Sequence, residues 1–292
     1  MSEHTPVLGF IGLGVMGGGM CRNAVKKHAG PVHVFDMAQA AVADQVASGA
    51  VAAASVADVA KHAEILFLSL PGGKQVAAVC DEIAQHAKPG TIVVDLSTTA
   101  VADARAIAAK FAEAGVHFAD APVARTRQAA IDGTLSIMVG ASEDLFTRIA
   151  PLLGYMGSDV TLCGDVGCGQ VVKLVNNTLL FEQVVAIAEM MVVAERAGVA
   201  PEKLIEAVGL GSGNSFALQT HGKKAMAPRN FPEKAFPSHY VLKDISYTLE
   251  LSEQMGVDAK IGKLAATYYQ AAVDAGIGEK YFPAIIELVG RE

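Results

Sequence analysis

The sequence predicts an α/β protein in which a doubly wound parallel sheet is followed by an all-helical second domain. Two observations lead to this fold class. Short apolar runs alternate with helix-compatible segments over the first part of the 292 residues, as they do in parallel sheets joined by crossover helices. After about Gly169 these runs stop, and long segments with helical periodicity replace them. We therefore expect residues 1–163 to form the first domain and residues 164–292 the second.

Apolar runs bounded by glycine, proline or aspartate predict the buried strands of the sheet. They lie at residues 7–11, 32–35, 65–70 and 91–95, and runs at 116–119 and 136–139 would extend the sheet. Alanine-rich segments between the runs have helical spacing and predict the crossover helices. These segments are residues 39–48, 56–62 and 75–86.

The second part contains helical segments separated by proline, glycine and serine. Residues 170–196 contain neither proline nor glycine, and apolar residues recur there at helical spacing. Further helices are expected at residues 201–208, 240–255, 261–274 and 282–289. Because 52% of the chain is hydrophobic, we expect these helices to be buried on more than one side. One such side would face a second subunit, so the sequence predicts a homo-oligomer.

The charge balance excludes two classes of partner. Lys and Arg number 23 against 30 Asp and Glu, which gives a net charge of -7. No basic cluster exceeds the pairs Lys26-Lys27 and Lys223-Lys224. Nucleic acids and anionic membranes are bound through a concentrated positive field, so neither is an expected partner.

Membrane spans, disulfides and metal sites are not expected either. The apolar-rich stretch at residues 178–194 is interrupted by two glutamates, whereas a span needs about 20 nearly uncharged residues. The four cysteines show neither a disulfide framework nor a CxxC spacing. His221 and His239 lack metal-ligand spacing and are interpreted as surface or supporting residues. Residues 1–6 show no secretory signal, so the default location is cytoplasmic.

A glycine-rich turn follows the first predicted strand and precedes a helix. Its residues are Gly12-Leu13-Gly14-Val15-Met16-Gly17, and the glycines have the spacing of the dinucleotide fingerprint. The first permits a sharp turn, the second lets the backbone approach a pyrophosphate, and the third lets the helix pack on the strand. The N–H groups at the start of the helix then face the phosphates. The turn predicts a dinucleotide site and a Rossmann-type first domain.

Asp36 ends the second predicted strand, about 20 residues after the last of these glycines, where the fingerprint has an acidic residue. Its carboxylate can accept hydrogen bonds from ribose hydroxyls and would repel a 2′-phosphate. The following Met37, Ala38 and Gln39 supply no arginine to hold such a phosphate. NAD is therefore expected as the cofactor in preference to NADP.

The segment from Gly9 to Met20 resembles the opening signature of the β-hydroxyacid dehydrogenases, which include 3-hydroxyisobutyrate dehydrogenase and tartronate semialdehyde reductase. Further blocks agree in order and spacing, so the resemblance covers essentially the whole chain. They are Leu70-Pro71, Asp95-Leu96-Ser97-Thr98, Asp120-Ala121-Pro122-Val123 with Gly133-Thr134-Leu135 and Met138-Val139-Gly140, the stretch from Gly169 to Asn177, and Lys243-Asp244. The family resemblance implies a homodimer or homotetramer.

The resemblance implies that Lys173 is the general acid and base. Oxidising an alcohol needs a base for the hydroxyl proton, and reducing the aldehyde needs the same group as an acid. A lysine with the ordinary pKa of about 10.4 would need a lowered pKa, for which burial and a nearby cation are the usual causes. Asn176 and Asn177 follow on the same helical face, and we expect both amides to be buried and to hydrogen-bond the substrate.

The resemblance also implies further contacts with the cofactor. Leu70, Pro71, Gln75 and Thr98 should line the nicotinamide half of NAD. Lys243 should reach the cofactor or the substrate from the helical domain. Without the resemblance, Gln75 and Thr98 are equally consistent with ordinary loop hydrogen bonds.

One block departs from the family. Many members follow Pro-Val with Ser-Gly-Gly, whose hydroxyl and backbone N–H groups hold the substrate carboxylate, whereas this chain has Ala124-Arg125-Thr126-Arg127. Arg125, with Thr126, can instead bind an oxyanion bidentately. The Pro-Val-x-Arg-Thr pattern resembles the sulfolactaldehyde reductase branch, although that branch has a serine where this chain has Leu180. A surface salt bridge is the alternative interpretation of Arg125.

The residues together predict hydride transfer between NAD and a small 3-hydroxy acid or its semialdehyde. Lys173 would handle the proton, while Arg125, Thr126, Asn176 and Asn177 would hold the substrate. A reductase of a sulfonated or otherwise anionic hydroxy-aldehyde is an alternative that depends on Arg125. A non-catalytic NAD-binding protein and an imine reductase are further alternatives, and the lysine argues against both.

Overall fold

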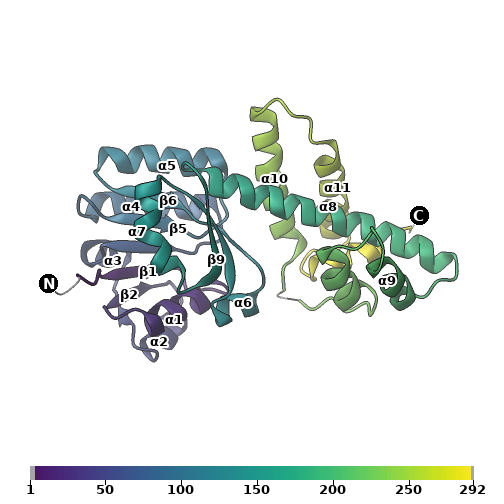
Figure 1. The fold of residues 1–292 in the computed structure, drawn as a ribbon, viewed down its shortest axis with the longest axis horizontal. Helices are drawn as coiled ribbons and strands as arrows, with labels where there is room; N and C mark the ends of the chain where they lie inside the picture. The colour runs from purple at the N-terminus through teal and green to yellow at the C-terminus, as the bar shows by residue number, and fades with distance from the viewer. Residues whose placement is uncertain (1–3, 234, 291–292) are drawn as a thin grey trace. The chain divides into compact units, whose positions relative to one another are not determined.

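The chain forms two compact units in the computed structural model, which describes residues 4–233 and 235–290 (Figure 1). The first unit ends at Lys173 and the second begins at Leu174. The boundary between the two compact units therefore lies inside helix α8, Cys168–Arg196. The reason is that the first turn of α8 is hydrogen-bonded to the sheet, as described below.

The first unit is built around one mixed sheet. Six strands run parallel in the order β3-β2-β1-β4-β5-β6, which confirms the doubly wound fold class. Beyond β6, strand β8 pairs antiparallel with β6 and β7, and β9 pairs parallel with β8. The strands are β1 Leu8–Ile11, β2 Val32–Phe35, β3 Val51–Ala52, β4 Ile65–Leu68, β5 Ile92–Asp95, β6 His117–Asp120, β7 Val123–Ala124, β8 Leu135–Gly140 and β9 Gly157–Gly164.

The sheet departs from parallel pairing at β8, which runs antiparallel to both β6 and β7. A parallel neighbour requires a crossover that carries the chain back along the whole sheet. After β6 the chain continues directly into β7, and only helix α6, Arg127–Asp132, lies before β8. A helix of six residues is too short for that crossover, so β8 returns antiparallel beside β6 and β7.

Side chains of neighbouring strand residues alternate between two apolar cores, one on each face of the sheet. Phe10 and Phe67 belong to one core, while Leu66 and Leu68 belong to the other. Helices α1, α2, α6 and α7 contribute to the first core and α3, α4 and α5 to the second. The helices are α1 Gly17–Lys27, α2 Gln39–Val46, α3 Val56–His62, α4 Gly73–His86, α5 Val101–Glu113 and α7 Glu143–Leu153, with α6 as given above.

The second unit is helical, as predicted. Phe181, Val184 and Ala188 of α8 are fully buried in its core, which also contains Tyr269 and Phe282. η1 is a π-helix in a segment for which the sequence predicted no helix, and η2 is a 3₁₀-helix within the predicted segment 282–289. The elements after α8 are α9 Pro201–Gly209, η1 Leu218–Met226, α10 Ser238–Gln254, α11 Lys260–Asp274 and η2 Phe282–Glu287.

Helix α8 is long and apolar enough to cross a membrane by length and composition alone, with a mean hydropathy of 1.5 over its most apolar part. Its side chains Phe181, Val185 and Met191 form part of the core of the second unit. A core helix meets the same criterion as a membrane span, so this length and composition are weak evidence for a span.

His221 is buried inside the second unit, where the sequence predicted a surface or supporting residue. It lies on η1, its Nδ1 is 2.7 Å from the hydroxyl of Tyr281, and its ring packs against Phe216 and Phe282. Burial, together with the charge of Lys224, lowers the pKa of His221 from 6.5 to about 4. His239 is exposed, as predicted, and pairs with Glu279.

The lowered pKa of His221 predicts a loss of stability in mild acid. The unfolded chain takes up the proton near pH 6.5, but the folded chain takes it up only near pH 4. Stability therefore falls as the pH drops from 6.5 towards 4, by at most roughly 1 kcal/mol per pH unit. We expect His221→Gln to remove this part of the dependence in urea unfolding between pH 7.5 and 4.5. His239→Gln is the matched control and should follow the wild type, and an identical slope in both variants would contradict the assignment.

Candidate active site

The three glycines of the turn after β1 differ in what surrounds them. Gly12 has a φ of +92°, and a Cβ there would overlap the carbonyl oxygen of Ser69. A Cβ on Gly17 would overlap the carbonyl oxygen of Gly12, so the start of α1 can pack on the turn only without a side chain. Around Gly14 nothing lies within 4 Å of where a Cβ would be. The fold therefore explains Gly12 and Gly17, while the space beside Gly14 fits a bound group.

Asp36 is held against this turn at the end of β2. Its Oδ2 accepts a hydrogen bond of 2.6 Å from the N–H of Leu13, and its Oδ1 accepts one of 2.8 Å from the N–H of Ala38. Each carboxylate oxygen can accept a further hydrogen bond. Helix α1 begins at Gly17 with no side-chain cap and no acidic residue in its first turn, so its N-terminus suits phosphate. These residues fit the phosphates and adenosine ribose of a dinucleotide.

The loops that follow β4 and β5 are joined by hydrogen bonds at the carboxyl edge of the sheet. The N–H of Leu70 donates to Ser97 Oγ at 2.9 Å, and the N–H of Ser97 donates to Asp95 Oδ1 at 2.9 Å. Leu70 and Thr98 are half-buried within these loops, while Pro71 and Gln75 are exposed. In parallel α/β sheets ligands bind outside this carboxyl edge, so the predicted nicotinamide-side residues have the appropriate location.

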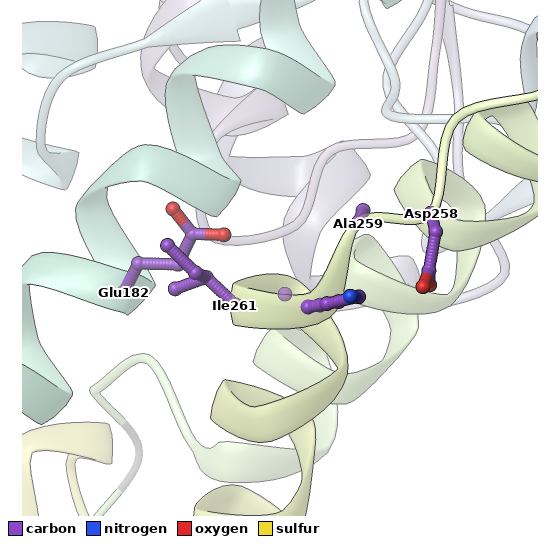
Figure 2. Close-up of a pocket in the computed structure, with 6 residues that line it drawn as sticks. Glu182, Asp258, Ala259 and Ile261 are labelled. Atoms are coloured by element: carbon purple, nitrogen blue, oxygen red, sulfur yellow. The ribbon is translucent and has the colours of Figure 1, made fainter.

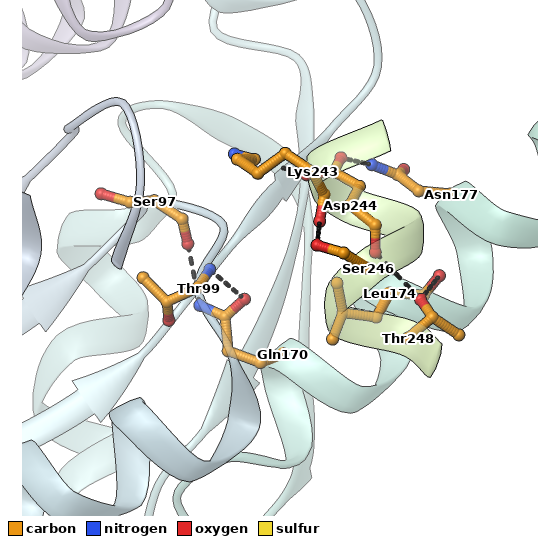
Figure 3. A network of polar contacts seen from close by, with 9 residues as sticks. All are labelled: Ser97, Thr99, Gln170, Leu174, Asn177, Lys243, Asp244, Ser246 and Thr248. Carbon is orange, nitrogen blue, oxygen red and sulfur yellow. Dashed lines mark hydrogen bonds and ion pairs between the residues drawn. The ribbon is translucent and has the colours of Figure 1, made fainter. Parts of the chain in front are cut away.

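The first turn of α8 is attached to the same edge by two side chains. Gln170 donates from Nε2 to the carbonyl of Ser97 at 2.8 Å and accepts at Oε1 from the N–H of Thr99 at 3.1 Å (Figure 3). Asp120, at the end of β6, accepts hydrogen bonds from the N–H groups of Gly167 at 2.6 Å and Gln170 at 2.8 Å. Thr98 therefore lies between two residues, Ser97 and Thr99, whose backbone groups are hydrogen-bonded to Gln170.

Lys173 lies three residues after Gln170 on α8, and only 9% of it is exposed. A lysine is rarely this buried unless its ammonium group is paired or used. Its helix position is set by the turn that Asp120 and Gln170 attach to the sheet. The structure thus places Lys173 in the first unit, about one helical turn after Gln170.

Asn177 follows Lys173 by four residues, belongs to the second unit and is buried, as predicted. Its Nδ2 donates to Asp244 Oδ2 at 2.7 Å (Figure 3). Asn176 is exposed, so the expectation of two buried amides is wrong for this residue. The cause is the geometry of the helix. Lys173 and Asn177 lie on its buried side, and Asn176 is turned from them towards the exposed side that carries Val172 and Val175. Its Nδ2 donates to Asn177 Oδ1 at 3.1 Å.

Lys243 is held within α10 by its neighbours. Its Nζ is 3.3 Å from Asp244 Oδ1 and lies over the rings of Tyr240 and Tyr247, 5.7 and 5.9 Å from their centroids. Its side chain is 26% exposed, so a polar group of a ligand can reach it. A shallow pocket elsewhere in the second unit, lined by Glu182, Asp258 and neighbouring residues of α11, contains none of the predicted site residues (Figure 2).

Arg125 occupies a backbone conformation that favours glycine, with a φ of +86°. Its guanidinium donates to the carbonyl of Thr134 at 2.5 Å, to Ser158 Oγ at 2.9 Å and to Asp159 Oδ2 at 2.7 Å. The salt-bridge interpretation of Arg125 therefore describes its contacts in the structure. Thr126 caps α6, because its hydroxyl oxygen accepts a hydrogen bond from the N–H of Ala129.

Sequence reasoning assigned no role to three residues that organise the site, namely Asp120, Gln170 and Asp244. Each lies in a quoted motif block; Asp120 also ends strand β6, and Asp244 directly follows Lys243. The available signal was the position of Asp120 at the carboxyl end of a strand, where ligand-binding and supporting residues gather. Its partner, the first turn of α8, is distant in sequence and could not be found from spacing.

Comparisons with known proteins agree with this geometry along the whole chain. The family model described as the NAD binding domain of 6-phosphogluconate dehydrogenase matches residues 7–164. The model described as "NAD-binding of NADP-dependent 3-hydroxyisobutyrate dehydrogenase" matches residues 167–289. Each model corresponds closely to one part of the chain, with α8 at the start of the second match.

Full-length relatives give the same result. The chain is 34% identical to 2-(hydroxymethyl)glutarate dehydrogenase of Eubacterium barkeri over 98% of its own length and 95% of the relative. It is 32% identical to NAD-dependent L-serine dehydrogenase of Pseudomonas aeruginosa, covering 96% and 97%. The solved 3-hydroxyisobutyrate dehydrogenase of Mycobacterium tuberculosis with L-serine has a TM-score of 0.91 and 30% identity, covering 99% and 100%. With its motif blocks in place and its relatives matched from end to end, this chain belongs to the β-hydroxyacid dehydrogenase family of dinucleotide-dependent oxidoreductases.

Proposed function

We propose that the chain transfers a hydride between NAD and a small 3-hydroxy acid or its semialdehyde, with Lys173 as general acid and base. The observation that supports this most directly is the location of Lys173. It is buried on the turn of α8 that Gln170 attaches to the loop containing Thr98. The relatives named for 2-(hydroxymethyl)glutarate, L-serine and 3-hydroxyisobutyrate all act on a hydroxyl group, which supports the same substrate class.

The residues have separate tasks in this proposal. When bound, NAD accepts the hydride from the alcohol carbon or returns it to the aldehyde carbon. Lys173 Nζ takes the hydroxyl proton in oxidation and donates it to the carbonyl oxygen in reduction. Asn177, whose Nδ2 is held by Asp244, presents its Oδ1 as an acceptor, and Asn176 donates to that oxygen. Burial of Lys173 lowers the competition from water for the same proton.

The two candidate substrate classes, carboxylates and sulfonates, differ in the anionic group that the site must recognise. Arg125 and Thr126 remain our candidates for an anionic group, and 2-(hydroxymethyl)glutarate, named for a relative, has two carboxylates. In the structure the guanidinium is paired with Asp159, so a substrate anion must replace that carboxylate. A sulfonated hydroxy-aldehyde is the second candidate substrate, because a sulfonate presents the same oxygens to a guanidinium.

Replacement of Lys173 tests the chemical step. We expect Lys173→Ala to lower kcat about a hundredfold or more, because a positioned acid and base contributes about that factor. The dissociation constant for NADH, measured by fluorescence, should stay near the wild-type value. Turnover is measured on 3-hydroxyisobutyrate, L-serine, 2-(hydroxymethyl)glutarate and sulfolactaldehyde. Lys203→Ala, on the exposed face of α9, is the matched control. Unchanged turnover in Lys173→Ala would contradict the mechanism, and NADH binding with no turnover by the wild type would favour the non-catalytic alternative.

Replacement of Gly14 tests the dinucleotide site separately from the fold. The space around Gly14 accommodates a methyl group, so Gly14→Ala should leave the Tm within about 1 °C of the wild type. It should weaken NADH binding by about tenfold or more, because the added carbon occupies the path of the pyrophosphate. Gly17→Ala is the contrasting control and should lower the Tm, since its Cβ overlaps a backbone oxygen. With Asp36 in place, NADH should bind more tightly than NADPH; a preference for NADPH would overturn the cofactor assignment.

We also propose that the exposed apolar side of α8 is covered by a second copy of the chain. Val175, Leu179, Met190 and Val193 recur at helical spacing and are 46 to 57% exposed. Ile261 of α11 is 66% exposed. Exposed apolar side chains gathered along one helix mark an interaction site in soluble proteins. Symmetric association of identical chains is the commonest way to cover such a surface.

A charge on this stripe tests the subunit contact. We expect Met190→Glu to lower the molar mass measured by light scattering from that of an oligomer towards that of one 30.2 kDa chain. The reason is the cost of burying an unpaired carboxylate in an apolar contact. Ile131→Glu places the same charge on an exposed apolar residue of α6 in the first unit and should leave the mass unchanged. A wild-type mass of one chain would contradict the proposal.

A further inference from the structure

We propose that Gln170 and Asp120 are positioning residues that set Lys173 for proton transfer at the carboxyl edge of the sheet. The inference rests on the proposed function of Lys173 and concerns the residues that determine its location. Neither residue is expected to touch the substrate. Both act through the first turn of α8, which contains no other side-chain anchor among the hydrogen bonds of the described residues.

Gln170 joins the loop that contains Thr98 to the helix that contains Lys173, and proton and hydride transfer require these two to be held at a fixed separation. Its amide is fully buried and makes both of its hydrogen bonds to the backbone of one loop, at Ser97 O and Thr99 N. Thr98, the expected nicotinamide-side residue, lies between those two positions. Lys173 follows Gln170 by three residues on α8, about one helical turn away. The side chain of Gln170 therefore holds the loop that contains Thr98 against α8, the helix on which Lys173 lies.

Asp120 fixes the start of the same helix. It is fully buried, and its two carboxylate oxygens accept from the N–H groups of Gly167 and Gln170. Two glycines make room for this contact. A Cβ on Gly140 would overlap Asp120 Oδ1, and a Cβ on Gly169 would lie 2.8 Å from Asp120 Oδ2 and overlap the carbonyl of Met138. The helix can approach the sheet this closely only because both positions lack a side chain.

The charge environment makes the Asp120 contact sensitive to pH. Burial raises the pKa of Asp120 to about 6, although the N–H groups of Gly167 and Gln170 and the charge of Arg105 on α5 oppose the rise. Burial and, to a smaller extent, the charge of Asp120 raise the pKa of the Cys163 thiol on β9. Below pH 6 Asp120 is protonated, and one oxygen no longer accepts an N–H. The attachment of α8 to the sheet should therefore loosen in mild acid.

Two variants test the proposal by kinetics. Gln170→Met keeps the length of the side chain but removes both hydrogen bonds, and Asp120→Asn keeps the shape but places an N–H₂ against one of the backbone donors. We expect each to lower kcat by about tenfold or more, since a displacement of about 1 Å at a reacting group costs on the order of a hundredfold. The dissociation constant for NADH should change by less than about twofold, because the glycine turn after β1 is untouched.

A matched control separates positioning from lost stability. Ser142 caps α7 by accepting from the N–H of Leu145, so Ser142→Ala also removes a cap from a helix of the first unit. It should lower the Tm with kcat unchanged. The pH profile gives a second readout: wild-type kcat should fall below about pH 6, and this limb should be absent in Asp120→Asn because an amide does not titrate there.

The outcomes distinguish this inference from the proposed function. If Lys173→Ala loses turnover while Gln170→Met and Asp120→Asn retain the kcat of Ser142→Ala, the positioning inference is overturned and the role of Lys173 stands. If Lys173→Ala retains turnover, the proposed function fails first. A loss of kcat in Gln170→Met at unchanged NADH affinity, with the acid limb missing in Asp120→Asn, supports the inference.

Discussion

The attachment of α8 to the carboxyl edge of the sheet is the contact on which the rest of the site depends. Asp120 and Gln170 make four hydrogen bonds there, all to or from backbone groups whose positions are set by β5, β6 and the helix itself. Backbone groups cannot rotate away as side chains can, so this joint is rigid. It explains why the compact first unit extends to Lys173 and why a lysine on a helix, usually solvated, is buried here.

Close approach of backbone segments is a second constraint, and it accounts for the glycines of the motif blocks. Gly12 and Gly17 shape the turn after β1, while Gly140 and Gly169 surround Asp120. Gly14 differs from these because the fold leaves it in open space. A glycine that the fold does not need indicates a bound group, which is a stronger argument for a dinucleotide than the spacing of glycines alone. The same comparison separates residues that maintain the structure from residues that bind.

Buried polar groups have a cost in this protein, and at the candidate site specific partners offset part of it. Burial raises the pKa of Asp120, while two N–H groups stabilise its charged form. Asn177 is buried with Asp244 as its partner. Arg125 and Arg229, the two described non-glycine residues with positive φ, are each held by a carboxylate, Asp159 and Glu195 respectively. Each ion pair holds the side chain of a residue whose backbone has a positive φ, although an exposed pair by itself contributes little to stability.

The sequence by itself determined the two-part α/β fold, the glycine turn with Asp36, and the family, because apolar periodicity and short motifs are local properties of the chain. It also singled out Lys173 and Asn177, which lie on one helical face at fixed spacing, as candidate site residues. Tertiary structure decided the antiparallel return of β8, the exposure of Asn176, the burial of His221 and the pairing of Arg125 with Asp159. It alone brought Asp120 to Gly167 and Gln170 to Ser97, which are far apart in sequence. These contacts depend on which segments meet in three dimensions, and no spacing rule within one segment contains that information.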